Sequence, residues 1–442
     1  MIDLADKTVV VIGAGRAGRA SVRLLLDRGA LVRLLEKEPS NVAGDWPSDR
    51  VKVTSDGDAA ALEDASLVVP SPGVARSHPV LVAAQANAVP IWSEIELASR
   101  YLACPIVAIT GTNGKSTTTV LIGNILRQAG GRVFVGGNLG IPLADAATDP
   151  RPYDFAVAEV SSFQLEWIER FRPRVAVWLN LTPDHQDRYA TVESYEAAKA
   201  ALLGQLRAGD TAVLNRDDAR VWSHRGDVQG EVFSFGLSEV DEGVYFDRGD
   251  AVVRRGGGEA RIALAGRPLR GAHNCENMMA AVAVASVLGI PSAAVESALD
   301  ATTGLPHRLE FVAEKAGARF YDDSKATNVG AVEKSIASFD DPIVLLLGGY
   351  DKGGDFGSLR DLIAARVERV VCFGAAGPSI AAQLGGISTF DVVPGVAEAV
   401  RLAASRARPG QAVVLAPGCA SFDEFHDYAD RGRRFRALVE SL

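Results

Sequence analysis

A short glycine-rich run carries the clearest chemistry in this sequence. Residues 110–117 read Thr-Gly-Thr-Asn-Gly-Lys-Ser-Thr, between an apolar stretch and a helical pattern. Glycines let successive backbone N–H groups point at phosphate oxygens, and the start of the following helix adds partial positive charge. Lys115 would neutralise the distal phosphates, and Ser116 would place its hydroxyl on Mg²⁺. Because Ile109 stands where the common pattern has an earlier glycine, we interpret the run as a shortened phosphate-binding loop.

A metal ion at such a loop needs further ligands, and two neighbouring strands supply candidates. In parallel sheets the carboxyl ends of adjacent strands meet at one edge. Glu159 ends the strand predicted over residues 155–160, and Asp184 and His185 follow the strand predicted over residues 175–180. We expect both strands to flank the strand of the loop, which makes Glu159 and His185 candidate metal ligands.

A second glycine turn lies near the start of the chain. Residues 13–18 read Gly-Ala-Gly-Arg-Ala-Gly after a predicted strand, and Glu36 ends the next strand. This spacing is the dinucleotide fingerprint, which favours an NAD-dependent oxidoreductase. The same turn can hold any diphosphate, and two phosphate sites in separate domains fit two nucleotides better than one. A turn that only packs a helix on a sheet, and a noncatalytic ATP-binding switch, are the remaining alternatives.

Composition limits the class of protein. The chain has 442 residues, which predicts two to four domains, and its net charge of −9 argues against nonspecific nucleic-acid binding. Its apolar runs are far shorter than the roughly 20 residues of a membrane-spanning helix. The four cysteines form no Cys-x-x-Cys pair and histidine is scarce, so we expect no zinc site. With no signal-peptide pattern, we expect a cytoplasmic protein.

The elements that must position these residues form three segments, each alternating apolar strands with helical patterns. This alternation predicts an α/β fold with mainly parallel sheets. Strands are predicted at 8–12, 31–35, 66–69, 106–110, 155–160, 175–180, 320–321, 343–347, 370–373 and 412–415. Helices are predicted at 17–27, 117–128, 192–206 and 277–288, the last apolar nearly all round and therefore buried. Residues 231–269 read as short strands separated by Gly and Asp, which predicts a small antiparallel patch.

Further motifs along the chain resemble those of the Mur ligases, the amide ligases of peptidoglycan precursor synthesis. Besides residues 110–117, runs follow in the family's order over nearly the whole chain: Gly137-Asn138-Leu139-Gly140, Glu159-Val160-Ser161-Ser162-Phe163-Gln164-Leu165, Asp184-His185-Gln186-Asp187-Arg188-Tyr189, Ala198-Lys199, His273-Asn274-Cys275-Glu276-Asn277, Pro306-His307-Arg308 and Asp323-Ser324-Lys325-Ala326-Thr327-Asn328.

Within the family, the sequence looks like the members that add D-glutamate. This similarity rests on the first glycine turn, Ser71-Pro72-Gly73, residues 324–328 and the run Cys419-Ala420-Ser421-Phe422-Asp423, and the Asp-Asn-Pro-Arg motif of diamino-acid-adding members is missing. The resemblance implies a Rossmann-like UDP-sugar domain (residues 1–96), a P-loop ATPase domain (97–304) and a Rossmann-like amino-acid domain (305–442). It also implies that D-glutamate is joined to UDP-N-acetylmuramoyl-L-alanine through an acyl phosphate, giving ADP and phosphate.

The resemblance implies a role for each matching residue. Catalysis would involve Lys115, Glu159, His185 and Lys199. Two Mg²⁺ ions would be held by Ser116, Glu159, His185 and Lys199, the lysine being carbamylated by CO₂. ATP would contact Gly111, Thr112, Asn113, Gly114, Lys115, Ser116, Thr117, Asn274, Arg308 and Asp323. The other substrates would contact Gly15, Glu36, Lys37, Ser71, Pro72, Gly73, Asn138, Ser161, Lys325, Thr327, Lys352, Ser421, Phe422 and Tyr428.

Some positions favour a different interpretation when the family resemblance is set aside. Lys199 lies on a helix among alanines, a pattern typical of a solvated lysine. Glu36-Lys37 stands where relatives carry Asp-Thr, and Tyr350-Asp351-Lys352 departs from the usual run. The first departure bears on the uracil contacts, and neither touches the central chemistry. The nearest alternative to the D-glutamate-adding reaction is a family member with another amino-acid substrate. We expect a monomer with no nucleic-acid partner and no membrane span.

Overall fold

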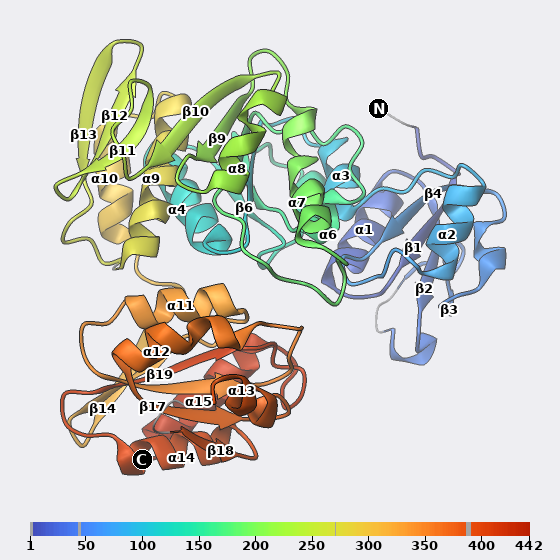
Figure 1. Ribbon diagram of the computed structural model, residues 1–442. Helices are drawn as coiled ribbons and strands as arrows, with labels where there is room; N and C mark the ends of the chain where they lie inside the picture. The colour runs from blue at the N-terminus through green and yellow to red at the C-terminus, as the bar shows by residue number, and fades with distance from the viewer. Residues whose placement is uncertain (1–2, 43–45, 270, 386–389) are drawn as a thin grey trace. The chain divides into compact units, whose positions relative to one another are not determined.

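The computed structural model describes residues 3–42, 46–269, 271–385 and 390–442 of the chain. Its backbone packs into two compact units. The first contains Met1–Leu181, Glu193–Ala265 and Glu276–Asp300, and the second contains Thr182–Val192, Gly266–Cys275 and Ala301–Leu442. Sheets of four and nine strands lie in the first unit and a six-stranded sheet lies in the second (Figure 1).

The four-stranded sheet has the order β3-β2-β1-β4 and is parallel throughout. Its strands are β1 (Thr8–Ile12), β2 (Leu31–Glu36), β3 (Val51–Ser55) and β4 (Ala65–Pro70). The accompanying helices are α1 (Arg16–Asp27), α2 (Pro79–Ala86) and α3 (Glu94–Ser99). Strand β3 escaped prediction because Lys52 and Thr54 interrupt its apolar run.

The nine-stranded sheet has the order β13-β12-β11-β10-β9-β8-β5-β7-β6. Its strands are β5 (Ile106–Thr110), β6 (Val133–Gly137), β7 (Phe155–Glu159), β8 (Val175–Trp178), β9 (Thr211–Asn215), β10 (Glu231–Gly236), β11 (Gly243–Asp247), β12 (Asp250–Arg255) and β13 (Gly258–Ala263). The helices are α4 (Lys115–Gln128), α5 (Leu143–Thr148), α6 (Ser162–Leu165), α7 (Val192–Ala200), α8 (Ala219–Ser223), α9 (Ala272–Val287) and α10 (Ser292–Ala301).

Two predictions for this sheet need correction. Strand β10 pairs parallel with β9 and β11, so the antiparallel part is confined to β11, β12 and β13, and it extends the main sheet. The helix predicted over 192–206 ends at Ala200 and is followed by a 3-10 turn, Leu203–Gln205. The prediction of a buried helix over 277–288 is confirmed, because Asn277–Ala285 of α9 are all buried.

The six-stranded sheet has the order β14-β15-β19-β16-β17-β18, and only the β14–β15 pairing is antiparallel. Its strands are β14 (Glu310–Lys315), β15 (Ala318–Asp322), β16 (Ile343–Gly348), β17 (Val367–Phe373), β18 (Phe390–Val393) and β19 (Ala412–Gly418). The helices are α11 (Val329–Ala337), α12 (Arg360–Arg366), α13 (Gly377–Gln383), α14 (Val396–Arg406) and α15 (Tyr428–Glu440).

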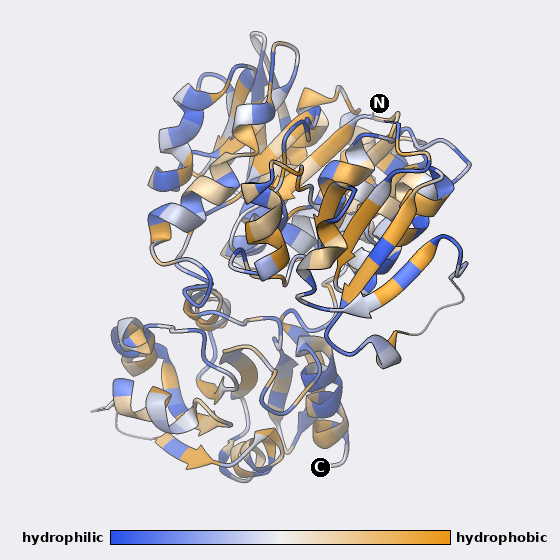
Figure 2. Ribbon diagram, turned by 90° about the vertical axis from the view of Figure 1, so that its right-hand side faces the viewer, coloured by the Kyte–Doolittle hydropathy of each residue, from blue (hydrophilic) through white to orange (hydrophobic). Residues whose placement is uncertain are grey.

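Apolar cores lie on both faces of this six-stranded sheet. Helices α11, α12 and α13 contribute to one core, and α14 and α15 contribute to the other. Figure 2 shows hydrophobic residues running along the strands, with hydrophilic residues in many connections. The predicted α/β fold with three mainly parallel sheets is confirmed. No helix of the described residues is long and apolar enough to cross a bilayer.

Helix α3 connects the two sheets of the first unit through two buried carboxyl groups. Glu94 accepts a hydrogen bond from the backbone N–H of Ala144 in α5 at 2.6 Å, and burial raises its pKa to about 7. Two residues further along the helix, one oxygen of Glu96 accepts the backbone N–H groups of residues 169, 170 and 171 at 2.8, 2.9 and 2.7 Å. Its other oxygen faces Nε of Arg100 at 2.5 Å. Glu96 thereby fixes the segment that leads into β8.

Candidate active site

The phosphate loop joins β5 to α4, which begins at Lys115. Gly111 and Gly114 have φ angles of +148° and +86°, a backbone conformation that other residues rarely adopt. A Cβ atom on Gly114 would lie 2.2 Å from Oδ1 of the buried Asn277. The loop therefore requires its glycines, and it leads to a helix N-terminus, which favours anions.

The protein itself holds the loop in shape. Strands β7 and β8 both pair with β5, as predicted. Just after β8, the backbone oxygen of Asn180 accepts the N–H of Thr112 at 3.0 Å, and its side chain exchanges hydrogen bonds with the backbone of Asn113 at 2.8 and 3.1 Å. Nζ of Lys115 donates to the carbonyl oxygens of Gly111 and Thr112 at 2.9 and 2.8 Å.

Glu159 lies at the end of β7 beside the first turn of α4. Its Oε2 accepts the hydroxyl of Ser116 at 2.6 Å, and its Oε1 accepts the side-chain amide of Asn138 at 2.7 Å. Both Ser116 and Glu159 are buried. A carboxylate and a hydroxyl beside a phosphate loop are the oxygen ligands that Mg²⁺ takes, so this pair fits the ion.

Lys199 is buried against the phosphate loop, with only 1% of its surface exposed. Its Nζ donates to the carbonyl oxygen of Gly111 at 2.9 Å and lies 4.5 Å above the ring of Tyr195. The hydroxyl of Tyr195 lies 3.3 Å from that of Thr112. The reading of Lys199 as a solvated lysine is therefore wrong, because helix α7 turns this side chain inward.

The N-terminal glycine turn has the tight form that its spacing predicts. Gly13 has a φ of +91°, and a Cβ on Gly18 would lie 1.8 Å from the carbonyl oxygen of Gly13. Glu36 accepts the backbone N–H groups of Ala14 at 2.7 Å and Lys37 at 2.9 Å. A cavity of about 330 Å³ opens here, lined by Ala14, Gly15, Arg19, Glu36, Lys37, Glu38 and Val42.

Ser71 reaches this turn from the end of β4. Its hydroxyl donates to the carbonyl oxygen of Gly13 at 3.1 Å, and Pro72 and Gly73 follow it directly. Ser161, predicted as a substrate contact, caps α6 through Gln164. The first unit thus contains the phosphate loop, the glycine turn, Glu159 and Lys199.

In the second unit, Asp184 contacts two polar side chains. Nζ of Lys352 lies 2.8 Å from its Oδ1, and the side-chain amide of Asn328 donates to Oδ2 at 2.9 Å. Burial acts to raise the pKa of Asp184, but the charges of Lys352 and His185 outweigh it and lower the pKa to about 2. His185 follows with a φ of +56°. Asp184 therefore stays an anion that orients Lys352.

Asp323 is buried at the end of β15. It accepts the backbone N–H of Leu309 at 3.3 Å and the hydroxyl of Ser335. Burial raises its pKa to about 6, opposed by the Ser335 hydrogen bond and the charge of Arg308. Asn274 lies in the first turn of α9, also within the second unit.

Two loops of the six-stranded sheet meet at Arg431, which is fully buried in α15. Its guanidinium donates to the hydroxyl and carbonyl oxygen of Ser324 at 2.9 Å each, and to the carbonyl oxygens of Cys419 and Ala420 at 3.0 and 3.1 Å. Burial lowers its pKa to about 10, so it remains a cation. Arg431 thereby fixes the two loops that carry most of the predicted amino-acid contacts.

These two loops present side chains of differing exposure. Nζ of Lys325 lies 3.9 Å above the ring of Tyr428. Thr327 is partly buried, Ser421 is buried, and Phe422 is 70% exposed.

Three residues at these sites escaped prediction. Asn180 could have been found from the sequence, because it ends a predicted strand beside the strand of the phosphate loop. Tyr195 could also have been found, because it lies one helical turn before Lys199. No sequence feature indicated Arg431, because an arginine on a polar helix is normally solvated.

The chain is similar to known proteins over most of its length. Family models match the chain at residues 7–93 (Mur ligase MurD-like, N-terminal domain), 109–285 (Mur ligase middle domain) and 307–419 (Mur ligase, glutamate ligase domain). Proteins named UDP-N-acetylmuramoylalanine–D-glutamate ligase from Geobacter metallireducens and Syntrophus aciditrophicus are 44% and 42% identical, over 100% of this chain and 99% of each relative. The solved MurF ligase from Thermotoga maritima in complex with ADP shares the fold, with a TM-score of 0.61 at 17% identity over 99% of this chain and 96% of that one. The chain therefore belongs to the Mur ligase family.

Proposed function

We propose that this chain is an ATP-dependent ligase that joins D-glutamate to UDP-N-acetylmuramoyl-L-alanine in peptidoglycan precursor synthesis. The observation that carries the proposal is the buried group of Ser116, Glu159 and Lys199 around the phosphate loop. The full-length relatives at 42% and 44% identity, whose names give this reaction, support the choice of substrates.

The reaction needs a leaving group before an amide can form from a carboxylate. Transfer of the terminal phosphoryl group of ATP to the alanyl carboxylate gives an acyl phosphate and ADP. The amine of D-glutamate then attacks the acyl carbon, and the tetrahedral intermediate collapses with loss of phosphate. The protein mainly aligns groups and neutralises charge, a role for which we propose Lys115 and residues 111–117 at the phosphates. On the family resemblance, Asn274, Arg308 and Asp323 are also proposed as ATP contacts.

Mg²⁺, when bound, would supply charge neutralisation at the transferring phosphate. We propose Ser116 and Glu159 as ligands of one ion, since their oxygens fit it. On the family resemblance alone, His185 and a carbamylated Lys199 are proposed for a second. Incubation with ¹³C-labelled CO₂ followed by NMR would test the carbamate, because an unmodified Lys199 gives no carbamate signal.

The N-terminal glycine turn is assigned to the diphosphate of the UDP-sugar, because family membership removes the reason to invoke NAD. Gly15, Glu36, Lys37 and residues 71–73 are the proposed contacts, and Asn138 and Ser161 are proposed as further substrate contacts. The cavity beside Glu36 supports this assignment.

D-Glutamate carries two carboxylates, and cations on the second unit suit them. We propose Lys325, Thr327, Lys352 and Ser421 as carboxylate contacts, with Phe422 and Tyr428 positioning the amino acid. The domain boundaries 1–96, 97–304 and 305–442, a cytoplasmic location and a monomeric state are also part of the proposal.

Phosphate release tests the function directly. The protein is incubated with ATP, Mg²⁺ and UDP-N-acetylmuramoyl-L-alanine, with D-glutamate in one arm and L-glutamate, glycine or L-alanine in the others. Release that depends on D-glutamate, with a product heavier by one glutamyl residue, supports the proposal. Release with another amino acid keeps the ligase chemistry and overturns the substrate, and no release with any of them overturns both.

A further inference from the structure

Helix α7 carries Lys199 but has little apolar anchoring of its own. Of its nine residues, only Tyr195 and Lys199 are buried. These two side chains lie one turn apart and meet the phosphate loop at Thr112 and Gly111. Because so short a helix is marginal by itself, other contacts must fix its position.

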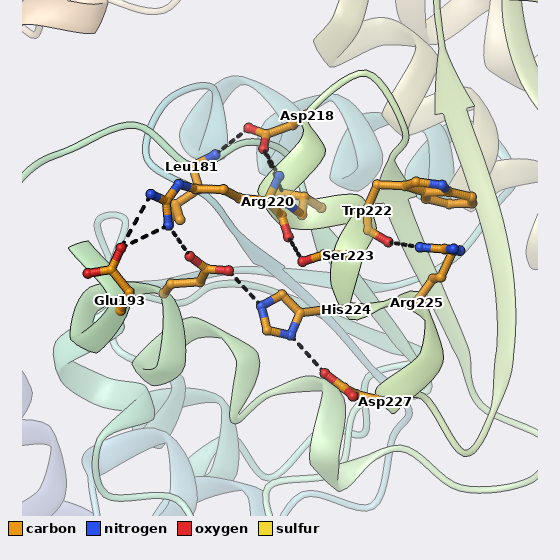
Figure 3. Close-up of polar contacts among 11 residues, drawn as sticks. Leu181, Glu193, Asp218, Arg220, Trp222, Ser223, His224, Arg225 and Asp227 are labelled. Carbon is orange, nitrogen blue, oxygen red and sulfur yellow. Dashed lines mark hydrogen bonds and ion pairs between the residues drawn. The ribbon is translucent and has the colours of Figure 1, made fainter.

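Helix α7 also carries Glu196, which is held by two side chains of the segment formed by α8 (Ala219–Ser223) and the 3-10 turn that follows it (His224–Asp227). Nη1 of Arg220 lies 2.6 Å from Oε2 of Glu196, and Nε2 of His224 lies 2.9 Å from Oε1. Figure 3 shows Arg220 and His224 extending from successive turns of this segment. Glu196 is 15% exposed, whereas Glu193, which Arg220 meets at 3.4 Å, is 71% exposed. Glu196 is thus the sheltered partner and Glu193 the solvated one.

The segment that holds Glu196 is itself fixed at its start. Asp218 caps α8, with one oxygen accepting the backbone N–H groups of Arg220 and Val221 at 3.1 Å each. Its other oxygen accepts the N–H of Leu181 at 2.7 Å, and Leu181 lies just beyond β8 (Figure 3). This capping residue therefore ties the segment to the strand beside the phosphate loop.

The same segment is fixed a second time through its histidine. The ring of His224, in the 3-10 turn His224–Asp227, stacks on buried Trp178 with ring centroids 5.2 Å apart. Trp178 belongs to β8 and pairs with Thr110, the last residue of β5. Strand β8 therefore contacts both His224, which holds Glu196, and β5, which leads into the phosphate loop.

We propose that Glu196 is a positioning residue for the ligase reaction, which sets α7 so that Lys199 meets the phosphate loop at Gly111. Arg220 and His224 hold the Glu196 carboxylate, so α7 cannot rotate or withdraw without breaking both contacts. The inference rests on the proposed function, in which Lys199, as a carbamate, is a ligand of the second Mg²⁺. A positioning role differs from a purely structural one, because the position of the Lys199 side chain depends on Glu196 while the integrity of the fold does not.

The test compares Glu196→Gln with Glu193→Gln, a matched change on the same helix. Phosphate release at saturating substrates gives kcat for folded protein, with folding checked by circular dichroism. Lys199 is probed with an amine-reactive reagent, and its labelling is read by peptide mass spectrometry. We expect Glu196→Gln to lower kcat on the order of tenfold, the scale found when a residue that orients a metal ligand is replaced, with the KM for ATP little changed. Labelling of Lys199 should rise, while Glu193→Gln should match the wild type in both readouts.

A folded Glu196→Gln protein with wild-type kcat and unlabelled Lys199 overturns the proposal. A loss of activity that only tracks the unfolded fraction also overturns it, in favour of a structural role. If Glu196→Gln does not fold, Arg220→Gln repeats both readouts from the other side of the contact. If the wild type releases no phosphate, the proposed function fails, and the labelling of Lys199 still decides whether Glu196 positions it.

Discussion

Replacing Gly114 with alanine tests the shape of the phosphate loop with one added carbon atom. Gly114 caps α4 with a φ of +86°, where a residue with a Cβ atom carries about 1–2 kcal/mol of backbone strain. The added Cβ would also lie 2.2 Å from Oδ1 of Asn277 and 3.3 Å from Cδ1 of Leu179. Either the Asn277 side chain or the phosphate loop must therefore move.

Asn277 cannot move aside freely. It is buried in α9, and its Oδ1 accepts the hydroxyl of Thr118 at 3.2 Å. Loss of that hydrogen bond costs about 1 kcal/mol, so we expect Gly114→Ala to lose about 2–3 kcal/mol in total. The alternative is that the loop shifts, and a displacement of about 1 Å at a reacting group costs on the order of 100-fold in rate. We therefore expect kcat to fall by about that factor.

Gly130→Ala is the matched control. Gly130 follows the other end of α4, has a φ of +91°, and has no heavy atom within 4 Å of its would-be Cβ. It should lose the strain energy of about 1–2 kcal/mol and keep wild-type turnover. Urea denaturation and phosphate release measure the two effects. Wild-type turnover in Gly114→Ala, or equal losses of turnover in both variants, would show that the contact with Asn277 does not fix the loop.

Three further outcomes follow from the described contacts. Glu159→Gln should fold normally but lower kcat on the order of 100-fold, because it removes the negative charge beside Ser116. It should also raise the Mg²⁺ concentration needed for turnover, and unchanged kinetics across a Mg²⁺ titration would contradict this. Glu96→Gln should cost about 2–3 kcal/mol in urea denaturation, since a neutral amide cannot serve both three backbone N–H groups and an arginine, while the half-exposed Glu169→Gln should cost less than about 1 kcal/mol. Asp184 has a folded pKa of about 2, below its ordinary 3.8, so its contribution of about 2 kcal/mol is complete above pH 4 and is lost as the pH falls toward 2. Asp184→Asn should remove this pH dependence from the denaturation midpoint, and an unchanged dependence would exclude the Lys352 pairing as its cause.

Much of the fold and part of the site could be predicted from local patterns. Apolar runs and glycine turns mark the parallel strands, and the rule that parallel strands end at one edge placed Glu159 beside the phosphate loop. The expected placement of β7 and β8 on either side of β5 is also found. These inferences hold because they depend on short stretches of chain and on how sheets are built.

Burial of charged side chains could not be predicted in the same way. Lys199 and Arg431 both lie on helices with polar sequences, and each is buried by elements distant in the chain. Strand β10 was placed in the antiparallel patch because Gly and Asp residues around it resemble hairpin turns, whereas its partner β9 is set by the sheet as a whole. The roles of the site residues stay predictions.

The edge formed by β12 and β13 offers a place to attach a reporter. The turn between them carries Gly256 and Gly257, both with positive φ and with open space where side chains would be. Strand β13 lies six strand positions from β5, roughly 30 Å along the sheet at about 4.8 Å per strand. A short peptide tag or a fluorophore inserted at this turn would leave the phosphate loop untouched, which would allow the enzyme to be immobilised or followed by single-molecule methods during turnover.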